Sequence, residues 1–336
     1  MEYTQLGSSG LRVSHLCLGT MEFGSSANED TAREIVNAAR DAHVNFVDTA
    51  DAYANGLSEK ILGKLIAEDR DAWVLATKVG QPDGPPERKK GLSRKWMLEA
   101  VDGSLKRLQT DYIDIYYLHH RDRETPLGET ISAMGDIIAS GKVSYWGFSN
   151  HYGWEIGEMV RLCDQLGVPR PVVAQPMYNL AMRMPENDYL PACKHYGIGV
   201  ATFSPLARGI LTGKYRMNEE LPADSRAARG DASLLNRDFQ PETFKLVDAI
   251  REHATARGIS PIDFAILWVL NNKTVSSVIG GPRTLEHWAA YLGALEHTFT
   301  SDDEALIDGL VRAGHPASPG LIWDRHPPLG RVTVTS

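Results

Sequence analysis

The sequence predicts an α/β protein built as a (β/α)8 barrel, also called a TIM barrel. Two observations support this fold: short runs rich in Val, Ile, Tyr and Phe alternate with longer segments of helical period, and there are eight such runs. Because α/β barrels of this length commonly form one unit, we expect residues 1–336 to make a single domain. The runs span residues 16–20, 44–48, 73–78, 113–119, 143–148, 172–175, 199–203 and 276–279.

The remaining elements are predicted by local signals around these runs. Before the first run, TQLGSSGLRVS predicts a β-hairpin that turns at residues 8–10, which we expect to close the bottom of the barrel. Ser93 precedes apolar residues at helical spacing in the segment 97–108, as an N-cap does. Ser260 and Pro261 predict the cap and first turn of a later helix, whose FAILWVL segment is apolar on all sides and should be buried.

Two segments break the alternation of strands and helices. Residues 206–240 are too long for an ordinary connection and mix Gly, Pro, Arg and Asp, which indicates a functional loop. The tail 314–336 contains four prolines, and we expect it to be irregular and to cover the barrel mouth. Neither segment is expected to separate two domains.

The overall composition narrows the class of protein. Hydrophobic residues make up 43% and charged residues 23% of the 336, which argues against disorder and coiled coils. The net charge of -8 offers no basic surface for nucleic acid. The three cysteines contain no CxxC pair, so neither disulfides nor a metal site are expected. Without a signal sequence or a membrane-spanning run, we expect a cytoplasmic protein with no membrane partner.

Reactive side chains stand where three successive runs end, and the chemistry of such barrels lies at these carboxyl ends. They are Asp48, Lys78 and His119, with Tyr53 just past the first. An isolated phenol titrates near about 10, and a nearby ammonium lowers that pKa. We therefore expect Tyr53 to transfer a proton, Lys78 to lower its pKa, and Asp48 to keep Lys78 charged. His119 would bond to the oxygen being reduced.

Each residue also has an ordinary structural explanation. Asp48 could cap a turn, Lys78 could be a solvated charge, and His119 beside His120 could be a hydrogen-bonded core histidine. The agreement of three successive strands, together with Tyr53, favours the catalytic interpretation.

Four motifs that carry these residues resemble the aldo-keto reductase family, over almost the whole chain. They are LGSSGLRVSHLCLGTMEFG, DTADAY, ATKVG and DYIDIYYLHHRD. The resemblance is to the branch that includes potassium-channel β subunits and bacterial aryl-alcohol dehydrogenase-like reductases. It implies the catalytic residues Asp48, Tyr53, Lys78 and His119, with His120 on the rim facing substrate.

The resemblance also implies NADPH/NADP+ as the cofactor. WGFSN and AQPMYN are similar to strand ends that hold the nicotinamide carboxamide. FSPLARGILTGKY resembles a segment in which an aromatic ring, here Phe203, stacks on the nicotinamide before the chain wraps the pyrophosphate. The cofactor contacts that the resemblance implies, in these segments, at the first strand ends and in DSRAARG, are Thr20, Met21, Asp48, Ser149, Asn150, Gln175, Phe203, Ser204, Pro205, Leu206, Gly209, Lys214 and Arg226.

A further segment, IGGPRTLEHW, predicts an anion site. Gly281 and Arg283 precede a capping threonine, so a helix N-terminus and a guanidinium converge, which suits the 2′-phosphate of NADPH. An ordinary Gly-Pro turn with a surface arginine is the alternative, and the family resemblance favours the phosphate site. Neither GxGxxG nor GxxxxGK[ST] occurs. Where relatives often carry a Glu-Asn pair for adenine, this chain has Ala290 and Tyr291, and His287 is the expected substitute contact.

The leading hypothesis is NADPH-dependent reduction of an aldehyde or ketone to an alcohol, with a small-molecule carbonyl as the partner. One alternative is a regulatory or sensor subunit that binds NADPH, like the channel β subunits. Another is a nucleotide-sugar ketoreductase with basic rim residues at Arg88, Lys89, Lys90, Arg121 and Arg123, although such charges more commonly form a solvated surface. The expected substrate contacts are Met21, Phe23, Tyr53, His119, His120 and, in the tail, Trp323.

The sequence does not define the oligomeric state. Trp154 and Trp288 are expected to be isolated surface aromatics, and single residues of this kind do not make a subunit interface.

Overall fold

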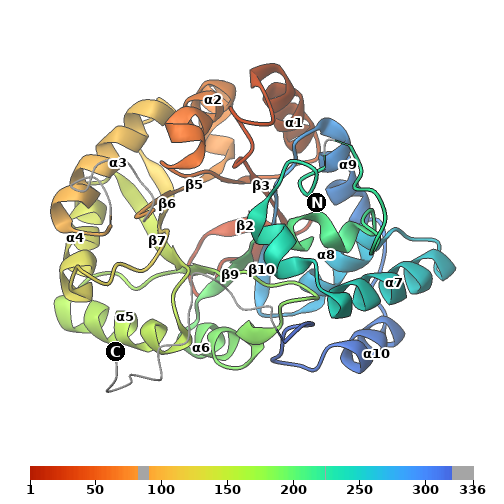
Figure 1. The fold of residues 1–336 in the computed structure, drawn as a ribbon. Coiled ribbons are helices and arrows are strands. Elements are labelled where there is room, and N and C mark those ends of the chain that lie inside the picture. The colour runs from red at the N-terminus through yellow and green to blue at the C-terminus, as the bar shows by residue number, and fades with distance from the viewer. Residues whose placement is uncertain (82–90, 224, 320–336) are drawn as a thin grey trace.

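The computed structural model describes residues 1–81, 91–223 and 225–319, and it contains a closed barrel of eight parallel strands (Figure 1). The strand order around the barrel is β10-β3-β4-β5-β6-β7-β8-β9. Each predicted run overlaps one barrel strand, so the predicted fold class is confirmed. The barrel strands are β3 (Leu16–Gly19), β4 (Phe46–Asp48), β5 (Val74–Val79), β6 (Ile113–Leu118), β7 (Val143–Ser149), β8 (Val173–Gln175), β9 (Gly199–Thr202) and β10 (Val275–Gly280).

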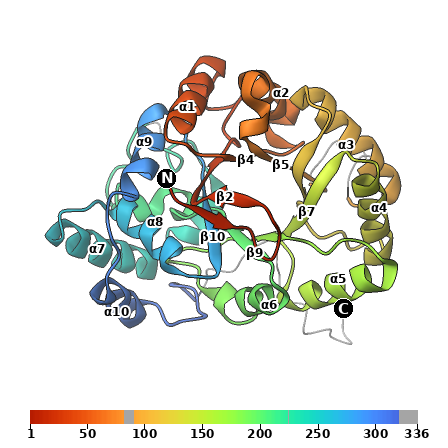
Figure 2. The ribbon, with the colours of Figure 1, turned by 180° about the vertical axis from the view of Figure 1, so that it is seen from behind.

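The predicted hairpin is present and lies across the amino-terminal ends of the barrel strands (Figure 2). It pairs β1 (Tyr3–Gln5) with β2 (Arg12–Ser14) in antiparallel register. Leu6 and Val13 are fully buried in the cluster that fills this end of the barrel. The turn approaches the chain before β9 so closely that a Cβ on Gly7, whose φ is +59°, would meet the Gly197 carbonyl oxygen at 2.5 Å. Only glycine fits such a position.

Helices surround the barrel, and two of them begin at the predicted caps. The Ser93 hydroxyl accepts from the Trp96 amide at the start of α3, and Ser260 forms a capping box with Asp263 at the start of α8. No helix in the described part of the chain has the length and apolar composition needed to cross a membrane. The helices are α1 (Glu29–Asp41), α2 (Leu57–Ile66), α3 (Arg94–Leu108), α4 (Leu127–Ala139), α5 (Gly153–Leu166), α6 (Tyr189–Tyr196), α7 (Pro241–Ala256), α8 (Pro261–Asn271), α9 (Leu285–Ala294) and α10 (Ser301–Leu310).

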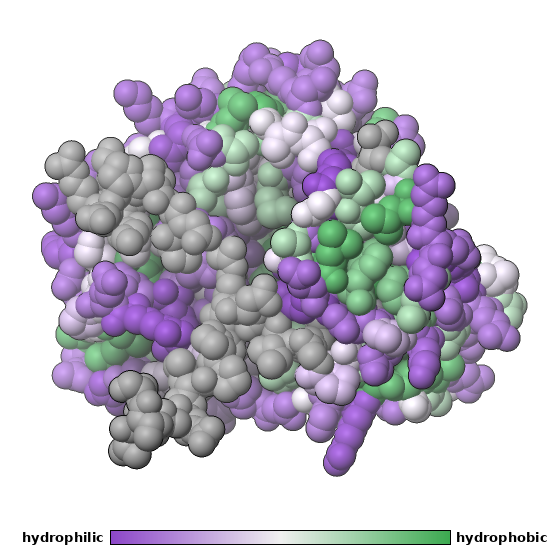
Figure 3. All heavy atoms as spheres, viewed as in Figure 1, coloured by the Kyte–Doolittle hydropathy of each residue, from purple (hydrophilic) through white to green (hydrophobic). Residues whose placement is uncertain are grey.

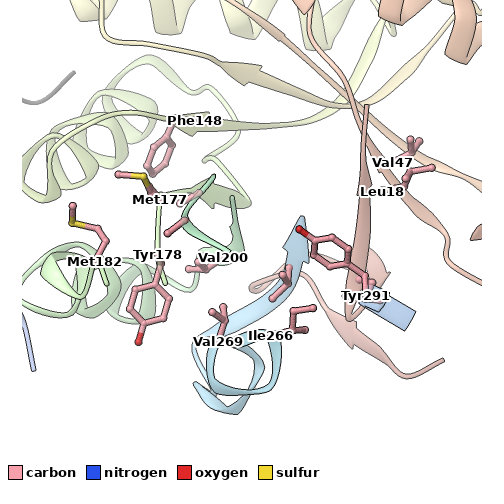
Figure 4. Close-up of a cluster of buried hydrophobic side chains, with 14 of the residues drawn as sticks. Leu18, Val47, Phe148, Met177, Tyr178, Met182, Val200, Ile266, Val269 and Tyr291 are labelled. Atoms are coloured by element: carbon pink, nitrogen blue, oxygen red, sulfur yellow. The ribbon is translucent and has the colours of Figure 1, made fainter. Parts of the chain in front are cut away.

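A continuous hydrophobic core lies between the strands and the helices, and Figure 4 shows part of it. Leu18, Val47 and Val200 from the strands share this core with Ile266 and Val269 of α8, and all five are fully buried. Burial of each such side chain stabilises the fold by about 1.5–3 kcal/mol. The core therefore fixes the strand ends, where the reactive residues stand.

One sequence expectation about this core is wrong. Trp288 is fully buried, because its position on α9 turns the indole toward Tyr291 and the barrel. Trp154, by contrast, is 64% exposed at the start of α5.

The two irregular segments behave differently. The connection after β9 contains short helical turns, η5 (Ala207–Thr212) and η6 (Leu234–Asp238). The start of the tail pairs with the loop after β8, where the Ala317 amide donates to the Ala181 carbonyl at 2.9 Å. The rest of the predicted tail, 320–336, lies outside the described residues.

Candidate active site

A cavity of about 460 Å³ opens at the carboxyl ends of the barrel strands. Figure 3 shows the corresponding face, with apolar side chains gathered over the region of α8 and the connection after β9. Of the predicted catalytic, cofactor and substrate residues that the structure describes, all except Lys78 and Phe23 line this cavity. The structure thus brings together Thr20, Met21, Asp48, Tyr53, His119, His120, Ser149, Asn150, Gln175, Phe203, Ser204, Pro205, Leu206, Gly209, Lys214, Arg226, Gly281, Arg283 and His287.

Lys78 lies directly behind the cavity wall and is 0% exposed. Its ammonium donates to a carboxylate oxygen of Asp48, to the Thr49 carbonyl at 2.7 Å and to the Tyr53 hydroxyl at 3.1 Å. An ammonium has three protons, and here each has an acceptor. Because the Tyr53 oxygen accepts from Lys78, its own proton is left to donate to a group in the cavity.

Strand pairing explains why these side chains meet. Asp48 of β4 lies opposite Ala76 of β5, and Lys78 follows two residues later on the same face of that strand. The short turn η1 (Tyr53–Gly56) then returns the phenol over the ammonium, which lies 4.7 Å from the ring centroid. The second carboxylate oxygen of Asp48 accepts from Gln175 Nε2 at 2.9 Å, so both of its oxygens are held.

The pKa values of this cluster correct one expectation from the sequence. Burial raises the pKa of Tyr53 above its ordinary value, and the charge of Lys78 opposes this without reversing it. Burial lowers the pKa of Lys78, but Asp48 and Tyr53 outweigh it, so the net shift is upward. Burial also raises the pKa of Asp48 against the opposing effect of Lys78. The sequence predicts a lowered pKa for Tyr53, and the loss of solvent around the phenol in the packed barrel is the physical reason for the difference. The phenol therefore keeps its proton.

Two histidines continue the wall on the other side of the tyrosine. The His119 ring meets the Tyr53 ring edge-on with 5.8 Å between centroids, and His120 stacks on His119 at 4.6 Å. Asn150, at φ +62°, donates from Nδ2 to the His119 carbonyl at 2.6 Å and to Ser149 Oγ at 2.9 Å. These contacts tie the ends of β6 and β7 together and fix the position of His119.

The loop after β9 enters the cavity in an unusual backbone conformation. Ser204, Ala207, Arg208 and Gly209 all have positive φ values, between 44° and 96°. The Asn179 side chain holds this loop by donating to the Ser204 carbonyl at 2.9 Å. Strained backbone of this kind gathers at functional sites.

The far end of the cavity is cationic. Lys214, Arg226, Arg283 and His287 line it, and Arg226 forms an ion pair with Glu22 at 2.7 Å. Burial lowers the pKa of Lys214, with a further contribution from Arg283. Burial also lowers the pKa of Arg283, and neighbouring arginines add to the effect. Mutual repulsion of this kind indicates a site that an anion would complete.

Comparison with known proteins places the chain. The family model "Aldo/keto reductase family" matches residues 15–312. A protein of Oryza sativa subsp. japonica named "Probable voltage-gated potassium channel subunit beta" is 42% identical over 290 residues, which cover 84% of this chain and 87% of that protein. A protein of the same name from Arabidopsis thaliana is 40% identical over 287 residues, with the same coverage. "Uncharacterized oxidoreductase YrpG" of Bacillus subtilis (strain 168) is 40% identical over 308 residues, 88% of this chain and 91% of that protein.

The chain belongs to the aldo/keto reductase family. This is an oxidoreductase family, and the resemblance seen in the motifs is thereby confirmed. The names of the relatives include both channel subunits and an oxidoreductase, so they do not by themselves assign an activity to this family member.

Several predicted residues of this aldo/keto reductase family member lie elsewhere. Phe23 is fully buried in the hydrophobic core and does not line the cavity, because the loop after β3 folds back to pair Phe23 with Ala27. Arg121 forms an ion pair with Glu155 at 2.6 Å and lies over the Tyr152 ring, outside the cavity lining. Arg123 is exposed and is not among the residues that line the cavity. Arg88, Lys89, Lys90 and Trp323 lie outside the described residues.

Other residues of the cavity were not singled out from the sequence. Gln81 stands three positions beyond Lys78, and this place on the rim is the signal by which it could have been found. Glu22 gave no such signal, because its partner Arg226 is 204 residues away in the chain. Ala290 and Tyr291, for which the sequence predicts no contact, also line the cavity. The remaining unpredicted lining residues are Gly19, Arg208, Thr212, Asp231, Ile262 and Ile279.

Proposed function

We propose that the protein reduces an aldehyde or ketone carbonyl to an alcohol with NADPH. The observation that carries the proposal is the Tyr53 hydroxyl on the cavity wall, held 3.1 Å from the ammonium of the fully buried Lys78. That arrangement leaves a phenolic proton available to a bound carbonyl oxygen and places a positive charge next to the phenolate that remains.

The residues present fit a phosphorylated dinucleotide. Phe203 and the positive-φ loop after it line the cavity, where the ring could stack on the nicotinamide. Lys214, Arg226 and Arg283 supply positive charge at the far end. Because the pKa values of Lys214 and Arg283 are lowered partly by neighbouring cations, phosphate groups would relieve a repulsion that already exists.

The protein groups perform the proton half of the reaction. Bound NADPH supplies the hydride for the carbonyl carbon. Tyr53 donates its proton to the carbonyl oxygen, Lys78 stabilises the resulting phenolate, and Asp48 keeps the ammonium charged and oriented. His119 lies against Tyr53 and orients the carbonyl oxygen. The carbonyl compound gains one hydride and one proton and becomes the alcohol. A proton from solvent then reprotonates Tyr53.

The substrate is a small carbonyl compound that enters beside Met21, which is 46% exposed at the cavity. The apolar side chains gathered on this face of the molecule favour aryl aldehydes (Figure 3). A panel of aldehydes that shows a preference for charged sugars would contradict this substrate class.

The test measures NADPH oxidation with an aldehyde panel in wild-type protein and in Tyr53→Phe. We expect turnover in the wild type and a loss of about 10²–10⁴-fold in the variant, since this is the usual contribution of a positioned general acid. Protein fluorescence titrated with NADPH should give the same affinity for both proteins. Equal turnover in both would overturn the role of Tyr53, and absence of NADPH binding would overturn the cofactor.

A second candidate is an NADPH-binding sensor subunit, favoured by two relatives that are named as channel β subunits. The Glu22–Arg226 ion pair supports it, because a contact between the loop after β3 and the loop after β9 would slow release of a cofactor beneath it. Tight NADPH binding with negligible turnover on every aldehyde would favour the sensor over the enzyme.

A further inference from the structure

We infer that His287 couples cofactor binding to uptake of a proton, so that the protein discriminates more strongly between NADPH and NADH as the pH falls. The inference rests on the proposed function and assigns a role to one residue of the same cavity. In the free protein the imidazole accepts a hydrogen bond from the Arg283 backbone; with a phosphate in place, it becomes a protonated donor.

The position of the His287 ring favours its neutral form in the free protein. His287 lies in the first turn of α9 and lines the cationic end of the cavity. Its Nδ1 accepts from the Arg283 amide at 3.4 Å, while its own amide donates to the capping hydroxyl of Thr284 at 3.3 Å. A backbone N–H can only donate, so Nδ1 carries no proton in this arrangement and the ring is neutral. The ring therefore accepts the hydrogen bond of the Arg283 amide, which could otherwise be donated to a phosphate oxygen.

The charge around the ring also favours the neutral form. Burial lowers the pKa of His287, and Arg283 and Lys214 lower it further. Glu286 on the same helix and Glu22 on the loop after β3 act in the opposite direction without reversing the shift.

Two more arginines belong to this environment. Arg226 and Arg229 lie in the connection after β9, and both contribute to lowering the pKa of Arg283. Since Arg226 already pairs with Glu22 at 2.7 Å, part of the negative charge near His287 is engaged elsewhere.

A bound phosphate would change both the hydrogen bonding and the protonation of His287. A phosphate monoester carries about −1.5 to −2 charge near neutral pH and offers three strong acceptor oxygens. One oxygen can replace Nδ1 as the acceptor for the Arg283 amide, which leaves Nδ1 able to take a proton from solvent. The added negative charge raises the pKa of His287 at the same time. Imidazole plus one proton becomes imidazolium, which then donates to the phosphate.

The sign of the pH dependence follows. The bound form holds a proton more tightly than the free form, so NADPH affinity increases as the pH falls through the pKa of the bound state. It levels off below the pKa of the free state, which lies under the ordinary histidine value of about 6.5. NADH has no 2′-phosphate, so its affinity should stay flat over the same range.

The experiment titrates protein fluorescence with NADPH and with NADH between about pH 5.5 and 8.5, the range in which histidine changes charge. The phosphate itself titrates near about 6, so wild type is compared with His287→Asn, whose amide oxygen can still accept from Arg283 without gaining charge. Relative to this variant, the wild-type Kd ratio of NADH to NADPH should rise about 3–10-fold from pH 8 to pH 6. His195→Asn on the exposed face of α6 is the matched control and should behave as wild type.

Calorimetry in two buffers of different ionisation enthalpy measures the proton directly. We expect fractional proton uptake when NADPH binds the wild type, and less uptake with NADH or with His287→Asn. If wild type and His287→Asn bind NADPH with the same pH profile and the same proton uptake, the inference is wrong and the proposed function stands. If NADPH binds at no pH, both fail together.

Discussion

The two ends of the cavity handle charge in opposite ways. At the catalytic end, Lys78 is fully buried and its ammonium is satisfied by Asp48, Thr49 and Tyr53. At the far end, Lys214 and Arg283 are partly exposed, and neighbouring cations help to lower their pKa values. The cation at the catalytic end is thus fully enclosed by protein acceptors, whereas at the far end several cations lie near one another at the cavity surface. Under the proposed function, the first arrangement serves the chemistry and the second serves anion binding.

The largest loss of stability should come from removing the buried cation Lys78 at the catalytic end of the cavity. Lys78→Met leaves the buried Asp48 carboxylate without its cation, and breaking a buried pair in this way costs about 3–5 kcal/mol of stability. Urea unfolding measures the loss, and carbonyl reduction should be lost as well. Lys214→Met at the far end is the matched control, and its stability should change by less than about 1 kcal/mol.

A double variant shows whether charge balance is the cause. Asp48→Asn combined with Lys78→Met removes both charges, so it should recover part of the stability lost in Lys78→Met alone. If the double variant is less stable than either single one, the buried charge does not explain the loss. An unchanged rate of carbonyl reduction in Lys78→Met would refute the role given to this lysine.

The next largest effect concerns NADPH affinity at the cationic end of the cavity. Arg283→Gln removes a guanidinium from the cationic cluster, so the Kd for NADPH should rise about 10–100-fold, equivalent to about 1.4–2.8 kcal/mol. The Kd for NADH should change less than about 2-fold. Fluorescence titrations at low and high salt measure both values. Equal weakening of both cofactors would show that Arg283 does not contact the 2′-phosphate.

A smaller effect is expected at the contact that joins the two loops across the cavity. Glu22→Gln keeps the shape of the side chain but removes its charge, so the ion pair with Arg226 is lost. Glu22 is buried and Arg226 is partly buried, so the pair should be worth at least the roughly 1 kcal/mol of an exposed pair, which corresponds to about 5-fold faster release of NADPH. A stopped-flow chase with excess cofactor measures this rate, and Glu158→Gln, which removes an ion pair with Arg161 on α5, serves as the control. Release at the wild-type rate would show that the ion pair does not retain the cofactor.

The comparison also separates what the sequence could predict from what it could not. Strand ends and helix caps depend on neighbours close in the chain, so the positions of Asp48, Lys78 and His119 followed from local patterns. Burial depends on the whole fold. The sequence therefore missed that Phe23 turns into the core and that Trp288 is covered.

The net pKa shift of Tyr53 was missed for the same reason. The sequence shows that a lysine lies near, but the size of the opposing desolvation is set by the packed barrel. Glu22 was missed because its partner is distant in the chain, and no local pattern joins them.

The smallest predicted effect concerns Asp51, a carboxyl group near the catalytic end whose charge is not fully compensated by its neighbours. Asp51 is half-buried beside this cluster, and burial together with Glu59 raises its pKa to about 7, although Arg107 and Lys78 oppose the shift. Its folded-state pKa thus exceeds the unfolded value of about 3.9, so the folded protein binds this proton more tightly. Stability should then fall as the pH rises from about 4 to 7 and change little above that.

Asp51→Asn removes this titration and keeps the shape of the side chain. Because Asp51 is partly exposed, solvent screening reduces the gain, and we expect the variant to be about 1 kcal/mol more stable than wild type at pH 8. At pH 4 the two proteins should unfold at the same urea concentration. A stability difference that stays constant across this pH range would mean that Asp51 has the same pKa in the folded and unfolded protein. Its charge would then be compensated by Arg107 and Lys78.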